Sequence, residues 1–272
     1  MIRRALQVAA RRLGPRPPRV AVLGTCRVFD AVQALDRAGR VALAKPFWGF
    51  PHSAPEIAQI VEVSEGRTRV PAPERREALN MRHMPDSGHG VPLAEAEVVV
   101  MELSSLKVYG LHGYVSQSNR LAAETGLHAF RIDQLLLAGG GAEPASADEA
   151  SALDGITAHR QTPAEAEAAL LAVIDALAPR PVILANHFVV EREGVHPALE
   201  VRRTLRDICE RVAAARPDRV LRFDPTPDLV ARDYPIEDYA HYEAGFTDVV
   251  GERLGALIHA AQRPARMKQR SG

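Results

Sequence analysis

The chain of 272 residues is long enough for one large domain or two small ones, and 46% hydrophobic with 25% charged residues is typical of a globular protein. Its 34 basic and 34 acidic side chains cancel, which argues against a dedicated nucleic-acid-binding protein. Two cysteines, Cys26 and Cys209, are too few for a disulfide framework or a zinc site and favour a reducing compartment. No apolar run approaches the roughly 20 residues of a transmembrane helix.

The two ends of the chain differ in character from the middle. Residues 1–18 predict a basic amphipathic helix followed by a proline-rich linker, without the continuous apolar core of a secretory signal. We therefore expect a cytoplasmic protein, with association to a membrane surface through this helix as the weaker alternative. Residues 263–272 are basic and predict a disordered tail. Residues 19–262 are expected to form a single α/β domain.

Short apolar runs alternate with amphipathic segments along the chain. The runs predict five strands, at residues 20–23, 41–47, 96–103, 181–185 and 219–223. The amphipathic segments predict helices at residues 30–38, 54–63, 118–127, 162–177, 197–215 and 243–261, with 131–137 either helical or extended. Continuous apolar strands alternating with helices are typical of a doubly wound, mostly parallel five-stranded sheet with helices on both faces.

Two stretches interrupt this alternation. Residues 67–92 are irregular and rich in Pro and Gly, which predicts a long loop and leaves open whether it closes over a site as a lid. Residues 138–154 are rich in Gly, Ala and Glu and poor in large apolar side chains, which predicts an exposed excursion. Cys209 falls on the apolar face of the 197–215 helix and is expected in the core.

The first strand leads into Gly24-Thr25-Cys26, and the apolar residues after Cys26 have helical spacing. A thiol at such a strand-to-helix turn lies near the positive end of a helix dipole, which can lower its pKa and favour the nucleophilic thiolate. The alternative is a small buried residue that merely fits the turn. Arg27, beside the thiol, could bind a phosphate or carboxylate or stabilise the thiolate.

A cysteine nucleophile needs a base within hydrogen-bond reach and an acid that orients the base. His241 follows Asp238 by three residues before the last predicted helix, so that carboxylate and imidazole can lie side by side. The alternative is an unrelated surface pair, since such short patterns arise by chance.

Polar residues follow the other strands at the edge where parallel sheets bind ligands. The backbone N–H of Cys26 and the side chains at the next strand ends are candidate donors to an oxyanion. For Ser104 and Ser105 helix capping is an equal alternative, and for Asn186 and His187 the alternative is an ordinary turn. His52, in the loop after the second strand, could form a wall of the same pocket.

Other motifs that would indicate a cofactor or metal are absent. No G-x-x-x-x-G-K-[ST], no G-x-G-x-x-G after a strand, no H-E-x-x-H and no paired C-x-x-C occurs, and the ten histidines are scattered. We therefore expect no metal and no required cofactor.

The order of these elements resembles the SGNH/GDSL hydrolase superfamily, which has a first strand leading into Gly-x-Cys/Ser and a late Asp-x-x-His before the last helix. It is most similar to the Cys-containing bacterial branch, the GSCFA-type proteins and the capsular-polysaccharide biosynthesis proteins that bind coenzyme A. The resemblance implies Cys26 as nucleophile, Asp238 and His241 as the acid–base pair, and Gly49 as the glycine whose N–H serves the oxyanion hole. The superfamily's Gly-x-Asn-Asp block is replaced here by Leu103-Ser104-Ser105.

The function that this resemblance implies is acyl-ester chemistry, by an acyltransferase or an esterase, on a carbohydrate or related polar substrate, with coenzyme A or acyl-CoA as a candidate donor. The alternative is a non-catalytic module that binds coenzyme A or a sugar. A thiol redox protein is a third reading, but it lacks a resolving cysteine close to Cys26. Whether the group is transferred or hydrolysed, and the oligomeric state, stay open.

Overall fold

The computed structural model describes residues 16–44, 48–71, 74, 79, 93–137, 142–189, 199–231 and 244–262. The predicted terminal helix and tail lie outside these ranges, as do most of the 67–92 loop and residues 138–141 of the excursion. None of the helices within these ranges is both long and apolar enough to cross a lipid bilayer.

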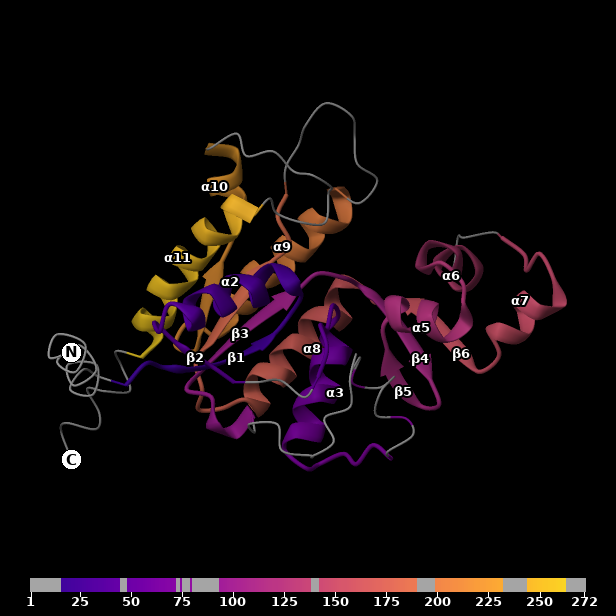
Figure 1. Ribbon diagram of the computed structural model, residues 1–272, viewed down its shortest axis with the longest axis horizontal. Helices are drawn as coiled ribbons and strands as arrows, with labels where there is room; N and C mark the ends of the chain where they lie inside the picture. The colour runs from indigo at the N-terminus through magenta and orange to yellow at the C-terminus, as the bar shows by residue number, and fades with distance from the viewer. Residues whose placement is uncertain are drawn as a thin grey trace, which may run out of the picture.

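A five-stranded parallel sheet forms the centre of the molecule, in the order β2-β1-β3-β7-β8 (Figure 1). Its strands are β1 (Arg19–Leu23), β2 (Ala42–Leu43), β3 (Val98–Leu103), β7 (Val182–Asn186) and β8 (Val220–Phe223). The predicted fold is therefore confirmed, and the described part of the second strand is shorter than expected. A parallel sheet covered on both faces explains why β3 and β7 are buried along their whole length and consist mainly of apolar residues.

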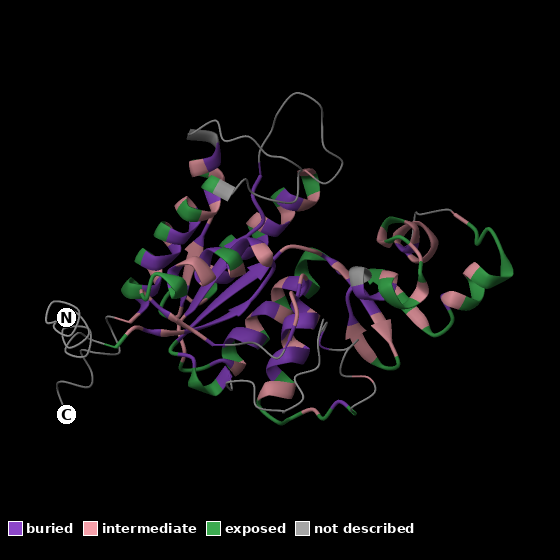
Figure 2. Ribbon diagram, viewed as in Figure 1, coloured by how far each residue is buried: buried purple, intermediate pink, exposed green. Residues whose placement is uncertain are grey.

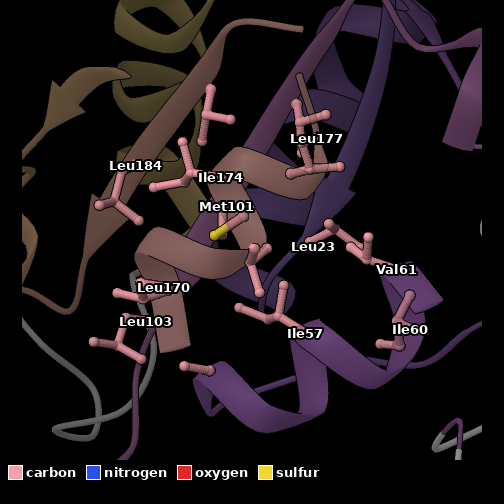
Figure 3. Packing of buried hydrophobic residues seen from close by; sticks show 14 of the residues in the cluster. Leu23, Ile57, Ile60, Val61, Met101, Leu103, Leu170, Ile174, Leu177 and Leu184 are labelled. Atoms are coloured by element: carbon pink, nitrogen blue, oxygen red, sulfur yellow. The ribbon is translucent and has the colours of Figure 1, made fainter. Parts of the chain in front are cut away.

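Helices cover the sheet on two faces, which gives three layers. The first face, built around Leu23, Met101 and Leu184, packs on helices α3 and α8 (Figure 3). Helix α9 packs on the same face. The second face, built around Val22, Val100 and Ile183, packs on helices α2 and α11. The bounds of these helices are α2 (Cys26–Arg37), α3 (Ala54–Ser64), α8 (Pro163–Ala176), α9 (Leu199–Ala215) and α11 (Ala244–Ala261). Cys209 lies in the first core, as expected.

Sequence reasoning missed a second sheet, inserted between β3 and α8. Three antiparallel strands pair in the order β5-β4-β6, with bounds β4 (Lys107–Leu111), β5 (Tyr114–Ser116) and β6 (Ile156–Arg160). His112 and Gly113, both with positive φ, join β4 to β5 in a two-residue hairpin turn. This His-Gly pair between apolar and aromatic residues was the available signal.

Short helices complete this inserted region and the chain's end. They are α5 (Ser118–Thr125), α6 (Ala129–Leu136) and α7 (Ala147–Ala152). A turn of 3₁₀ helix, η1 (Leu93–Glu95), precedes β3, and α10 (Thr226–Ala231) follows β8. The inserted region has its own small core around Tyr109, Leu121 and Ile132. It lies to one side of the three layers, and α7 is mostly exposed, as predicted for the excursion (Figure 2).

Candidate functional site

The turn from β1 to α2 places Cys26 at the first position of the helix, on the carboxyl edge of the sheet. Gly24 allows this turn to approach β3 closely, since a Cβ there would lie 2.7 Å from Cβ of Glu102 and 2.8 Å from Cγ2 of Val28. Thr25 has the extended conformation of an N-cap, but its hydroxyl does not cap the helix. Cys26 is half-buried.

Glu102 is the residue at this turn that sequence reasoning missed. Its carboxylate is 1% exposed and accepts hydrogen bonds from the Thr25 N–H at 3.0 Å, from the Thr25 hydroxyl, and from Arg27 Nε at 2.8 Å. Successive side chains of a strand point to opposite faces of the sheet. Glu102 therefore lies on the α2 face of β3 together with the apolar Val98 and Val100, whereas Met101 and Leu103 lie on the other face. A lone charged residue inside a strand buried on both faces needs a partner, and that was the signal.

The charges around Cys26 do not favour a thiolate at rest. Burial raises the pKa of the Cys26 thiol, and the nearby carboxylates of Asp30 and Glu102 raise it further. The Arg27 guanidinium and a hydrogen bond from the Arg27 N–H lower it, but less than burial raises it. The prediction of a thiol with a lowered pKa at the helix start is therefore wrong, because burial is the largest influence on the Cys26 pKa and the net shift is upward.

His52 and the two serines form a cross-link between neighbouring elements at this edge. The carbonyl of His52 accepts the backbone N–H groups of Ser104 at 3.0 Å and Ser105 at 2.9 Å. The Ser105 hydroxyl accepts the Lys107 N–H at 2.9 Å, so it orders the turn into β4 and caps no helix. Burial and the positive charge of Arg27 lower the pKa of His52 to about 4. His52 is therefore a neutral imidazole at pH 7.

Gly49 does not supply the free N–H that the resemblance implies. Its N–H donates to the carbonyl of Leu79 at 2.7 Å. An N–H that is already hydrogen-bonded within the protein cannot also stabilise an oxyanion without a rearrangement. Gly49 is therefore not assigned to the oxyanion hole in this structure, contrary to the expectation from the resemblance.

Asn186 and His187 end β7 beside this region and are both buried. The Asn186 amide donates to the His187 carbonyl at 2.9 Å and to Asp224 Oδ1 at 3.2 Å, while its own Oδ1 has no hydrogen-bond partner. His187 Nδ1 lies 3.1 Å from the Phe188 carbonyl, which fixes the tautomer with Nε2 unprotonated. Burial, then the charges of Arg27 and Arg202, lower the pKa of His187 well below its usual range.

The structure thus brings several predicted site residues to one edge of the sheet. Thr25 and Arg27, the two chain neighbours of Cys26, are both hydrogen-bonded to Glu102, and the charges of Arg27 and Glu102 act on His52. Asp238 and His241 lie outside the described residues, so their place beside Cys26 stays a prediction. Among the described residues, no group of three or more His, Cys, Asp or Glu side chains is arranged to hold a metal ion.

The parallel sheet with helices on both faces makes this an α/β protein, with a cysteine at its first strand-to-helix turn. A family model describes it more closely: the TviD N-terminal domain, matched over residues 18–256. The chain belongs to this family, which is named after the N-terminal domain of a Vi capsular polysaccharide acetyltransferase. Membership places the chain among hydrolase- or acyltransferase-type enzymes.

Solved structures with a similar fold are only distantly similar in sequence. An acetyl-xylooligosaccharide esterase from Geobacillus stearothermophilus matches at 11% identity and a TM-score of 0.46, covering 89% of this chain and 94% of that one. An α/β hydrolase from the metagenome of Lake Arreo, Spain, matches at 16% identity and a TM-score of 0.41, covering 89% and 95%. No curated protein matches the sequence.

Proposed function

We propose that this protein carries out acyl-ester chemistry on a carbohydrate, with Cys26 as the nucleophile. The observation that carries the proposal is the half-buried thiol at the β1–α2 turn, on the carboxyl edge of the sheet, in a chain of the TviD N-terminal domain family. Sγ attacks the acyl carbonyl and the donor's oxygen or sulfur leaves, which gives a thioester on Cys26. A sugar hydroxyl then takes the acyl group in transfer, or water takes it in hydrolysis, and the thiol is restored.

A base is required at the moment of attack, because burial raises the pKa of Cys26 and keeps the thiol protonated. We assign this role to His241, oriented by Asp238, from their spacing and the family resemblance. The imidazole would take the Sγ proton and later give it to the leaving group. His52 and His187 are neutral at pH 7 and lie within the influence of Arg27, which disfavours the imidazolium that a base must become.

Trapping the thioester tests the nucleophile directly. Wild-type protein incubated with acetyl-CoA, or with an activated aryl acetate, is expected to gain one acetyl group by intact mass, located on Cys26 by peptide mapping. Cys26→Ala should lose the adduct and the turnover. Cys209→Ala is the matched control, since Cys209 is fully buried and burial raises the pKa of its thiol to about 12. An acetyl group that still forms in Cys26→Ala would contradict the assignment.

The second candidate is a non-catalytic module that binds coenzyme A or a sugar. The raised pKa of the Cys26 thiol favours it, because binding needs no thiolate. Calorimetric titration with coenzyme A separates the two functions: a binding module retains its affinity in Cys26→Ala and shows no turnover as wild type. Turnover that depends on Cys26 rejects this candidate.

A further inference from the structure

We propose that Glu102 is a positioning residue for the Cys26 nucleophile, which it orients by holding the residues on both sides of it. This inference rests on the proposed function of Cys26. Neither the sequence motifs nor the family match assigns Glu102 a role.

The Glu102 carboxylate accepts hydrogen bonds from both chain neighbours of Cys26, Thr25 and Arg27, and we call this arrangement the Glu102 clamp. Oε2 accepts the N–H of Thr25 at 3.0 Å and also its hydroxyl, while Oε1 accepts Nε of Arg27 at 2.8 Å. Cys26 is the one residue between these two anchors. Because its neighbours are both tied to the same rigid strand, the thiol has little freedom to move relative to the sheet edge.

Burial argues that the clamp serves orientation more than stability. The side chains of Arg27 and Glu102 are 7% and 1% exposed, and a buried ion pair is seldom more stabilising than apolar residues of the same volume. The other positions of β3 are apolar, so a valine would suit the packing at residue 102. Three hydrogen bonds from one turn are what a carboxylate at this place adds.

Only a carboxylate satisfies both ends of the clamp. All three groups that point at Glu102 from Thr25 and Arg27 are donors, so both of its oxygens must accept. An amide would place an NH₂ group against a donor at one end. The carboxylate also opposes Arg27 in its action on Cys26, since Arg27 lowers and Glu102 raises the pKa of the thiol.

The first test removes one bond of the clamp and leaves the ion pair intact. Thr25→Val deletes the hydroxyl bond to Glu102 and keeps the side chain's shape. We expect kcat to fall roughly 10-fold with KM and the pH dependence of thiol alkylation unchanged, because geometry is altered and charge is not. Thr25→Ser, which retains the hydroxyl, should restore kcat. Equal kcat in Thr25→Val and wild type would overturn the proposal.

The second test adds a readout that needs no turnover, the alkylation of Cys26, and this readout separates the proposal from the proposed function. The rate of iodoacetamide alkylation at Cys26 is measured against pH. In Glu102→Gln the thiol pKa should fall and alkylation at neutral pH should accelerate, while acyl transfer is lost. Arg27→Gln combined with Glu102→Gln should slow alkylation again, to the wild-type rate or below it, because Arg27 acts on the thiol pKa more strongly than Glu102, and acyl transfer should stay lost. Glu97→Gln, at an exposed glutamate paired with Arg16 just before β3, is the control and should change neither.

The outcomes are distinguishable. An unchanged alkylation profile in Glu102→Gln, or full acyl transfer in it, overturns the role of Glu102. A shifted profile in a protein whose wild type never forms an acyl adduct supports the clamp and rejects the proposed function. If Glu102→Gln does not fold, the kcat comparison of Thr25→Val with Thr25→Ser decides.

Discussion

Two regions of the molecule hold glutamates in opposite ways. Beside His52 and Ser53, Glu56 is buried at the start of α3, and burial raises its pKa to about 7, although it accepts bonds from Ser53 and from the His52 N–H. In the inserted region, Glu149 pairs with Arg131 through two bonds, at 2.7 Å and 2.9 Å. Those bonds lower the pKa of Glu149 to about 2.

The difference shows how the two regions use charge. In the inserted region, Arg131 and the Ala145 N–H compensate the Glu149 carboxylate, and these bonds hold a loop and two helices together. At the sheet edge, the carboxylates of Glu102 and Glu56 are buried away from water and accept hydrogen bonds from the backbone N–H groups of Thr25, next to Cys26, and of His52. Charge there is expensive to bury, and changing it should therefore affect both stability and activity.

The largest expected effect is the loss of the buried pair at Glu102. Glu102→Ala removes the carboxylate of a buried ion pair with Arg27 and should lower the free energy of unfolding by roughly 3–5 kcal/mol, as for other broken buried ion pairs. Glu149→Ala, which removes the Arg131 pair, should change it little. Urea unfolding followed by circular dichroism gives both values. Equal losses in the two variants would break the distinction drawn between the regions.

A smaller effect concerns pH. Between pH 4.5 and 7, folded Glu56 keeps a proton that the unfolded chain releases, so its contribution to stability falls as pH rises. His52 and His187 act with the opposite sign: they stay neutral when folded and take up protons below about pH 6.5 when unfolded. Their contribution is present above pH 6.5 and is lost as pH falls toward 4.

Glu56→Gln removes the opposing contribution of Glu56, so the loss of stability on acidification that His52 and His187 cause should become larger. The free energy of unfolding, measured by urea titration from pH 7 to 4.5, is expected to fall more steeply with acidification than in wild type, by about 1 kcal/mol per pH unit. Glu165→Gln is the control, since Glu165 occupies the same place in the capping box of α8 but bonds from Thr162 lower its pKa. If the free energy of unfolding of Glu56→Gln depended on pH as it does in wild type, the raised pKa of Glu56 would not contribute to stability.

How far the sequence predicts this molecule depends on what each residue's neighbours supply. The five parallel strands and the core position of Cys209 follow from apolar runs and spacing, because burial on both faces leaves a local record. The direction of the Cys26 pKa shift did not follow, because burial is its largest cause and arises only in the folded chain. The smaller influence of Glu102 likewise depends on the pairing of β1 with β3, since Glu102 lies more than 70 residues away. Gly49 was misassigned for the same reason: its N–H is engaged by Leu79 across a loop.

The smallest predicted effect compares two helix starts of the same type. Ser53 begins α3 and Thr162 begins α8, each in a capping box with a glutamate three residues on. Replacing either by Ala should cost about 1 kcal/mol of stability, measured by thermal unfolding. Ser53 is fully buried and follows His52, whose carbonyl holds the N–H groups of Ser104 and Ser105. Ser53→Ala should therefore also reduce the rate of acyl transfer, whereas Thr162→Ala, on a helix start remote from Cys26 in this network, should leave that rate unchanged. A loss of rate in both variants, or in neither, would show that the His52 cross-link does not position the site.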